Sequence, residues 1–167
     1  ESMPETIEIG GIGGATEWQP ALAGVDTVVH LAARVHVPAD DSDDTWRTYY
    51  EENVVATEAL ALAAVAQKVR RFIFVSSLAV HGNDDVPRPI RAEDDPHPLS
   101  PYARSKWEAE QVLHRVRRDH GLDVVVLRPP SVYGPGNPGN MLRLLRLVER
   151  RIPLPFGAVH NRRSMIY

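Results

Sequence analysis

The sequence predicts an α/β fold built on a doubly wound parallel sheet. Three short segments, residues 25–33, 71–77 and 123–129, are almost continuously apolar, as expected of strands that are covered on both faces. Helical segments at residues 45–67 and 101–120 separate them. Because strand and helix alternate, the connections should be right-handed crossovers and the strands should run parallel.

The two helices carry different sequence signals. Residues 45–67 combine a few bulky apolar side chains with many alanines, which predicts a helix with a broad buried face of little bulk. The second helix has an N-cap serine at Ser100, a proline at its first position, Pro101, and a terminating glycine, Gly121. These residues predict where the second helix begins and ends.

The chain changes character after the third predicted strand. Residues 129–140 are rich in proline and glycine, and a further helix is predicted over residues 141–151. We therefore expect a second lobe to begin in the proline- and glycine-rich stretch.

Composition limits the classes of protein to be considered. The 167 residues are 43% hydrophobic and 25% charged, as in soluble globular proteins. The net charge is −3 with no long basic run, so we expect neither a nucleic-acid nor a membrane partner. The absence of cysteine excludes disulfides and thiol catalysis, and we expect no metal site. Without a bilayer-spanning stretch or a secretion signal, a cytoplasmic location is favoured.

A glycine-rich stretch at residues 7–16 resembles the turn that binds a dinucleotide. Such a turn needs a preceding strand, a following helix and an acidic residue about 20 positions on. Residues 17–23 are interrupted by Pro20 and are too short for a crossover helix, and the next strand ends in His30 and small residues. We therefore interpret the stretch as a loop that enters a short helix.

Tyr102 and Lys106 form the first candidate site. They lie four positions apart on a predicted helix, so their β-carbons should share a face at roughly 5–6 Å. A tyrosine with an ordinary pKa of about 10 needs help to exchange a proton near neutral pH. A neighbouring ammonium would lower the pKa of Tyr102 and could also bind a ribose hydroxyl. A surface tyrosine and a solvated lysine would show the same spacing.

Ser77 strengthens this candidate site. It closes the predicted strand at residues 71–77, and ligands bind at the carboxyl ends of parallel strands. Its hydroxyl could therefore face Tyr102 and stabilise the oxygen of a reacting alcohol or ketone. Because side chains alternate, only one of Ser76 and Ser77 should point into the site. Alternatively, both serines satisfy backbone groups at the end of the strand.

Three motifs resemble those of a known family. They are "FIFVSSLAVHG", "SPYARSKWEAE" and "LRPPSVYGPGN". Their order and spacing resemble those of the extended short-chain dehydrogenase/reductases, in the NAD-dependent epimerase/dehydratase branch. With "VVHLAARVHV" and "PLPFGAVHNRRS", the chain is most similar to bacterial UDP-N-acetylhexosamine 4-epimerases and 4-ketoreductases. The resemblance implies a Rossmann-like fold, NAD (with NADP not excluded), a nucleotide-sugar substrate and a homodimer.

The resemblance also assigns roles to individual residues. It implies that Tyr102 is the acid/base, that Lys106 tunes it and binds the nicotinamide ribose, and that Ser77 contacts the substrate oxygen. Asn53 matches a structural or proton-relay position. The implied cofactor contacts, besides Tyr102 and Lys106, are His30, Leu31, Ala32, Ala33, Pro129 and Pro130, and the further substrate contacts are Ser131, Asn140 and Arg163.

The chain also departs from the family pattern. Dehydratases of this branch carry an Asp-Glu pair directly after the active-site hydroxyl residue, where this chain has Leu78 and Ala79, so dehydration is disfavoured. By resemblance, the family's first glycine-rich turn would precede Glu1. We therefore expect an incomplete fold that is inactive alone. Residues 1–135 would be the central part of the cofactor-binding domain, and residues 136–167 the truncated start of the substrate-binding region.

The predicted function is NAD(P)-dependent oxidation and reduction at C4 of a UDP-hexose or UDP-N-acetylhexosamine, by a 4-epimerase or a 4-ketoreductase. One alternative is a regulatory protein that binds NAD(P) without chemistry. Another is a serine hydrolase that uses Ser76 or Ser77 with His81, although no G-x-S-x-G elbow surrounds either serine.

Overall fold

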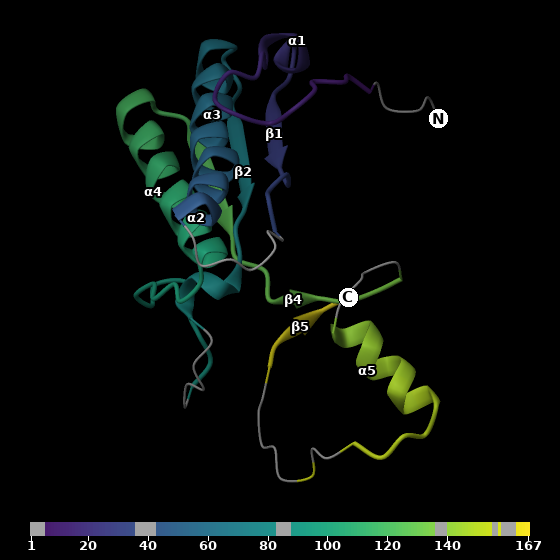
Figure 1. Ribbon diagram of the computed structural model, residues 1–167. Coiled ribbons are helices and arrows are strands. Elements are labelled where there is room, and N and C mark those ends of the chain that lie inside the picture. Colours follow the sequence, from purple (N-terminus) through teal and green to yellow (C-terminus); the bar gives the residue numbers. More distant parts are fainter. Residues whose placement is uncertain (1–5, 36–42, 83–87, 136–139, 155–156, 158–162) are drawn as a thin grey trace.

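The computed structural model has an α/β architecture (Figure 1). It describes residues 6–35, 43–82, 88–135, 140–154, 157 and 163–167. A parallel sheet has the strand order β1 (Thr27–His30), β2 (Arg71–Val75) and β3 (Asp123–Leu127). All three predicted strands are therefore confirmed, and each is shorter than predicted.

The register of the sheet brings the carboxyl ends of the strands to one edge. Thr27 pairs with Arg71, which pairs with Asp123 at the start of β3. An ion pair of 2.7 Å joins the side chains of Arg71 and Asp123 at this amino-terminal edge. The opposite edge, where His30 ends β1, is the one at which parallel sheets bind ligands.

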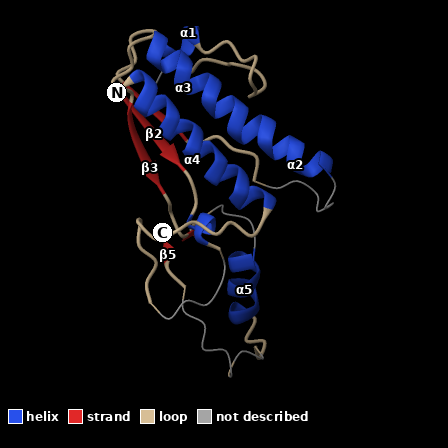
Figure 2. Ribbon diagram, turned by 90° about the vertical axis from the view of Figure 1, so that its left-hand side faces the viewer, coloured by secondary structure: helices blue, strands red, loops and turns tan. Residues whose placement is uncertain are grey.

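Helices occupy the connections between these strands. The described helices are α1 (Gln19–Leu22), α2 (Asp43–Tyr49), the π-helix η1 (Tyr50–Val55), α3 (Ala56–Ala66), the 3₁₀-helix η2 (Leu78–His81), α4 (Pro101–His120) and α5 (Asn140–Glu149). Figure 2 shows α3 and α4 side by side along the sheet, and the two helices pack against each other. Among the described helices, none is long and apolar enough to cross a membrane.

The prediction of one helix over residues 45–67 is only partly right. A π-helical turn at Tyr50–Val55 interrupts it, between α2 and α3. A π-helical turn contains an extra residue, which rotates the following side chains relative to an α-helix. Asn53 lies within this turn and is 2% exposed, so the turn directs a polar side chain into the protein.

The bounds of α4 agree with those that its capping residues predict. The Ser100 hydroxyl accepts a hydrogen bond from the backbone N–H of Ala103 at 3.1 Å. Gly121 has φ +72°, in the left-handed region, and its N–H donates to the carbonyl of Arg117 at 2.9 Å. Glycine reaches this conformation without a steric penalty, so it ends the helix cleanly.

The hydrophobic core lies between the sheet and the α3–α4 layer. Phe72 and Phe74 of β2 are fully buried and belong to one cluster with Leu113 of α4. Residues of the opposite sheet face are more open, and Val29 and Leu127 are 53% and 48% exposed. Within the described segments, helices therefore cover one face of the sheet.

The glycine-rich stretch near the N-terminus forms turns, as predicted. Thr16 closes it by donating to the carbonyl of Gly11 at 2.8 Å and accepting from the N–H of Gly13 at 2.9 Å. Ile9 and Ile12 pack against the core, and the helix that follows, α1, has four residues. The stretch is therefore a capped loop rather than the strand, turn and helix of a dinucleotide site.

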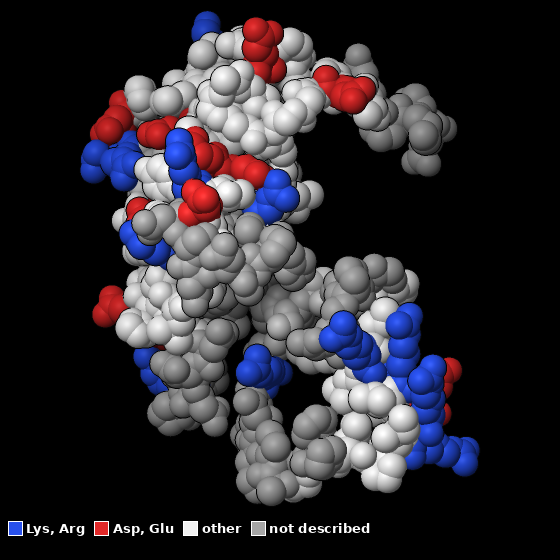
Figure 3. Space-filling view, in the orientation of Figure 1, with Lys and Arg blue, Asp and Glu red and all other residues white. Residues whose placement is uncertain are grey.

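The last part of the chain forms a small separate sheet with a helix. Strand β4 (Ser131–Val132) pairs in parallel with β5 (Met165–Ile166), and α5 begins one residue before its predicted start. Figure 3 shows basic side chains gathered over α5, which carries Arg143 and Arg146. The predicted junction at residues 129–140 falls between β3 and α5.

Candidate active site

The candidate site lies where the carboxyl ends of the strands meet the first turns of α4. Ser77 follows β2, and Tyr102 and Lys106 lie in the first two turns of α4. Pro129 follows β3, and its carbonyl accepts a hydrogen bond from the N–H of Leu78 at 2.9 Å. The structure thus brings residues from three predicted segments to one edge of the sheet.

Ser77 lies close to Tyr102. The phenol is half-buried, and burial raises the pKa of Tyr102, while a hydrogen bond with Ser77 acts in the opposite direction. The ring of Tyr49 lies edge-on to that of Tyr102 with 6.3 Å between centroids. Ser77 also accepts a hydrogen bond from the N–H of Ala79 at 3.2 Å. This serine therefore caps the turn after β2 and lies close to the phenol.

Ser76 points elsewhere, as side-chain alternation predicts. Its hydroxyl donates to a carboxylate oxygen of Glu110 at 2.5 Å, and Ser76 itself is 3% exposed. Of the two serines, Ser77 is the one that lies close to Tyr102.

Lys106 is a buried cation. It is 2% exposed, and its Nζ lies 4.2 Å from the centroid of the Phe74 ring. Burial lowers the pKa of Lys106 to about 8, and the negative charge of Glu110 opposes this shift. Within the described residues, no hydrogen-bond partner of the ammonium is found, so its donors are open to a ligand.

One electrostatic expectation is wrong. Lys106 was expected to lower the pKa of Tyr102, but that pKa is raised, first by burial of the phenol. The two residues share a helix face, yet the ammonium lies over the Phe74 ring. The positive charge of Lys106 acts on His30 instead. Burial and this charge lower the pKa of His30 to about 4.

His30 is therefore neutral at pH 7, and its hydrogen bonds define which nitrogen carries the proton. Its Nε2 lies 2.9 Å from the hydroxyl of Thr57. That hydroxyl donates to the carbonyl of Asn53 at 2.7 Å, so it accepts from His30. His30 thus donates through Nε2 and keeps a lone pair on Nδ1.

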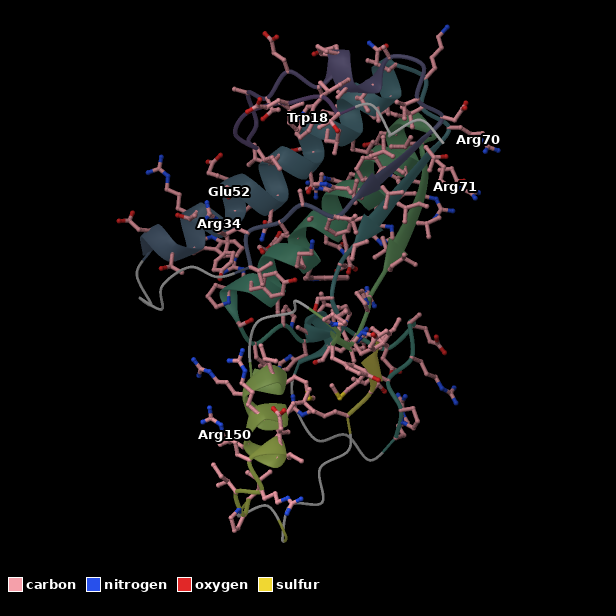
Figure 4. The ribbon with its side chains drawn as sticks, turned by 90° about the vertical axis from the view of Figure 1, so that its right-hand side faces the viewer. Trp18, Arg34, Glu52, Arg70, Arg71 and Arg150 are labelled. Atoms are coloured by element: carbon pink, nitrogen blue, oxygen red, sulfur yellow. The ribbon has the colours of Figure 1, made fainter. Side chains whose placement is uncertain are left out.

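Asn53 ties the loop after β1 to the start of α4. Its side-chain amide accepts from the N–H of Arg34 at 2.7 Å and donates to the carbonyl of Arg34 at 3.0 Å. It also donates to Ser105 at 2.9 Å, and the Ser105 hydroxyl donates to the carbonyl of Tyr102 at 2.8 Å. Figure 4 shows Arg34 beside Glu52, with which it forms an ion pair of 2.7 Å.

The remaining sequence-predicted residues lie around this edge or in the small second sheet. Leu31 and Ala32 are exposed, and Ala33 is half-buried, directly after β1. Ser131 is exposed in β4, and Arg163 is exposed two residues before β5, the partner of β4. Pro130 precedes β4 and is half-buried, and Asn140 begins α5, but its side chain lies outside the described residues.

The residues present fit a nicotinamide dinucleotide. The Lys106 ammonium is buried and its N–H groups have no hydrogen-bond partner among the described residues, so they can donate hydrogen bonds to ribose hydroxyls. Ala32 and Ala33 have small side chains, so a cofactor can approach the end of β1 closely. In the parts of the chain that the structure describes, no group of three or more His, Asp or Glu residues is arranged to hold a metal ion.

Three residues of the site were not predicted from the sequence. They are Phe74 under the ammonium, Tyr49 beside the Tyr102 ring, and Glu110, which binds Ser76. Two signals could have indicated them. Phe74 alternates with Phe72 on the helix-facing side of β2, and Glu110 follows Lys106 by one helical turn.

Comparison with known proteins identifies the family. Residues 3–167 match the family described as "NAD dependent epimerase/dehydratase family". The chain therefore belongs to the NAD-dependent epimerase/dehydratase family, and the earlier resemblance is confirmed.

Relatives and solved structures of this family are similar along most of the chain. The chain is 41% identical to a UDP-glucose 4-epimerase of Vibrio cholerae, over 96% of this chain and 49% of that protein. The UDP-N-acetylglucosamine 4-epimerase of Methanobrevibacter ruminantium superposes with a TM-score of 0.76 at 29% identity, over 92% and 51% of the two chains. The UDP-glucuronic acid 4-epimerase of Bacillus cereus, solved with NAD, gives 0.71 at 29% identity, over 84% and 44%. The chain thus spans about half the length of these proteins.

Proposed function

We propose that the protein to which this chain belongs catalyses NAD-dependent oxidation and reduction at C4 of a nucleotide sugar, as a 4-epimerase or a 4-ketoreductase. The convergence of Ser77, at the end of β2, with Tyr102 and the buried Lys106, in the first two turns of α4, is the observation that carries this proposal. Family membership and the 4-epimerase relatives support it.

Each of the three side chains has a distinct task. Tyr102 takes the proton of the C4 hydroxyl as the alcohol is oxidised and returns it when the ketone is reduced. Ser77 hydrogen-bonds the same substrate oxygen and stabilises the charge that develops on it. Lys106 binds ribose hydroxyls through its open donors. NAD, when bound, supplies the acceptor and donor for the hydride at C4.

The sequence around Ser77 favours this reaction over dehydration. Expelling water from a sugar needs an additional acid and base, and the two positions after Ser77 are Leu78 and Ala79. Neither side chain can exchange a proton, which supports simple oxidation and reduction at C4.

In this proposal the second lobe binds the nucleotide part of the substrate. We assign residues 1–135 to the cofactor-binding domain and residues 136–167 to the start of the substrate-binding region. Ser131, Asn140 and Arg163 are the proposed substrate contacts, and a guanidinium is well suited to a diphosphate because its fork pairs with phosphate oxygens. A homodimer of the complete protein remains part of this proposal.

The test uses the complete gene product with UDP-glucose and UDP-N-acetylglucosamine, and product analysis for the C4 epimers. Y102F should reduce turnover at least a hundredfold while NAD binding stays within about threefold, because only the proton-transfer group is lost. Y50F is the matched control, since Tyr50 is 39% exposed, and it should retain activity.

Full activity of Y102F would contradict the assignment of Tyr102. NAD binding by the unaltered protein without conversion of either sugar, or of their 4-keto forms with NADH, would favour the regulatory protein instead.

A further inference from the structure

A fully buried carboxylate lies behind the candidate site and has no task in the function proposed above. Glu110 is 0% exposed, and both of its oxygens are bound. Oε1 accepts from the Ser76 hydroxyl at 2.5 Å and from Nε of Arg128 at 3.1 Å, and Oε2 accepts from Nη2 of Arg128 at 2.6 Å. We call Ser76, Glu110 and Arg128 the Glu110 clamp.

Arg128 is held on its other side as well. Its Nη1 lies 2.9 Å from Nε2 of His81 and donates to the carbonyl of Ala92 at 3.1 Å. A guanidinium can only donate, so His81 accepts through Nε2. The guanidinium is thus fixed in one orientation, and Arg128 cannot turn away from Glu110 without breaking several hydrogen bonds.

Stability alone does not explain such a cluster. Removing two charges from water costs about as much free energy as their attraction returns. Apolar side chains of similar size often give a protein of equal stability. What a bidentate pair adds is a defined geometry between the segments that carry its members.

Each member of the Glu110 clamp is tied to a residue of the candidate site. Ser76 precedes Ser77, Arg128 precedes Pro129, and Glu110 lies one helical turn after Lys106. The backbone reinforces these links, because the N–H of Ser76 donates to the carbonyl of Leu127 at 2.7 Å. The clamp therefore joins the ends of β2 and β3 to α4 close to the site.

We propose, on the basis of the function proposed above, that the Glu110 clamp is a positioning device: it fixes the turn after β2 against α4 so that the Ser77 hydroxyl stays directed at Tyr102. Ser76 is its link to Ser77, since adjacent extended residues direct their side chains to opposite sides. Anchoring Ser76 on Glu110 determines where Ser77 points.

Ser76→Ala is the variant of choice. It removes one hydrogen bond and no charge, whereas a change at Glu110 would leave the Arg128 guanidinium, which is only 17% exposed, without its carboxylate partner and would risk unfolding the protein. R71Q is the matched control, because the ion pair of Arg71 with Asp123 joins the same two strands at their far ends.

The experiment is a double-mutant cycle in the complete gene product. S76A, S77A, the double variant and R71Q are compared for kcat and KM with the nucleotide sugar that the unaltered protein converts. The ¹³Cζ NMR signal of Tyr102, assigned by its loss in Y102F, reports the contact with Ser77 without turnover.

We expect S76A to lower kcat at least fivefold and to change KM less than threefold. The kcat of the double variant should lie within twofold of the kcat of S77A. The Tyr102 signal should move alike in S76A, S77A and the double variant, and stay in place in R71Q. Unaltered kcat and signal in S76A, or kcat losses that multiply in the double variant, would overturn the positioning role. If the unaltered protein converts no sugar, the proposed function fails, and the Tyr102 signal alone decides on the clamp.

Discussion

The ammonium of Lys106 lies 4.2 Å from the centroid of the Phe74 ring, and both side chains are at most 2% exposed. A buried ammonium loses its hydration, and the negative face of an aromatic ring returns part of that free energy, about 0.5–2 kcal/mol. Phe74 thus keeps a cation in the interior whose donors remain open to a ligand. The contact explains how α4 can present a charged lysine at the edge of a hydrophobic core.

Replacing the ring should make Lys106 easier to deprotonate. In F74L the cation loses the aromatic face, so the pKa of Lys106 should fall below its value of about 8, by roughly half a unit to one unit. An NMR titration of ¹³Cε-labelled lysine measures this pKa, and K106M assigns the signal.

F72L provides the control for lost packing. Phe72 is also 0% exposed and lies two positions earlier on the same strand, so both variants should lose roughly 1–2 kcal/mol of stability. Only F74L should change the titration of Lys106. Equal pKa shifts in the two variants would mean that the ring of Phe74 has no specific effect on the cation.

Removal of the charge itself should stabilise the protein without ligand. The pKa of Lys106 is lowered from 10.5 to about 8, so between these pH values the unfolded chain binds more protons than the folded one. Stability attributable to Lys106 therefore rises with pH across this window, and the full cost, about 3 kcal/mol, is present below pH 8.

K106M should accordingly be more stable than the unaltered protein by about 3 kcal/mol at pH 7, and the difference should shrink towards pH 10.5. Urea denaturation at several pH values measures it. A difference that is the same at pH 7 and pH 10 would show that packing, rather than charge, is responsible.

Local signals explain why much of the fold could be predicted. The bounds of α4 follow from Ser100, Pro101 and Gly121, each of which acts within one turn of its own position. The strands are apolar because they are buried, and their order with the helices implies a parallel sheet. The same local reasoning placed Ser77 and Tyr102 at one edge.

Long-range contacts explain what could not be predicted. The π-helical turn accompanies hydrogen bonds of Asn53 to Arg34 and Ser105, which lie 19 and 52 positions away. The direction of the Lys106 ammonium likewise depends on Phe74, in another element. No spacing within a single segment contains this information, and for that reason the expected effect of Lys106 on Tyr102 was wrong.

Asn53 can be tested through the three hydrogen bonds of its side chain. N53A leaves both backbone groups of Arg34 without this partner and should cost roughly 2–4 kcal/mol of stability. N53D retains an acceptor for the Arg34 N–H but turns a second acceptor towards the Arg34 carbonyl.

The introduced carboxyl should therefore have a raised pKa, because burial and the facing carbonyl disfavour its charge. A raised folded-state pKa means that stability is lost as pH rises, so N53D should be less stable at pH 7 than at pH 5, relative to N53A at the same pH values. Urea denaturation of both variants at the two pH values checks this, and an N53D protein as stable as the unaltered one would contradict the assigned hydrogen bonds.

Gly82 and Gly121 differ in the backbone strain and in the crowding that a replacement by alanine should meet. Both have positive φ angles, but Gly121 (φ +72°, ψ +15°) lies in the left-handed helical region, which costs a residue with a β-carbon roughly 1–2 kcal/mol, whereas Gly82 (φ +87°, ψ −176°) lies in a region that essentially only glycine adopts. At Gly121 an added β-carbon would meet open space, so G121A should lose only the roughly 1–2 kcal/mol of backbone strain.

At Gly82 the β-carbon would come within 3.0 Å of the carbonyl oxygen of His97, a backbone atom that has to move. His97 in turn donates its N–H to the carbonyl of Val80 at 2.8 Å, so its displacement strains the contact between the turn after β2 and the segment that leads into α4. G82A should therefore lose about 1 kcal/mol or more beyond G121A in urea denaturation, because it adds both backbone strain and crowding. Equal losses would show that neither the backbone conformation of Gly82 nor the approach of His97 constrains this turn.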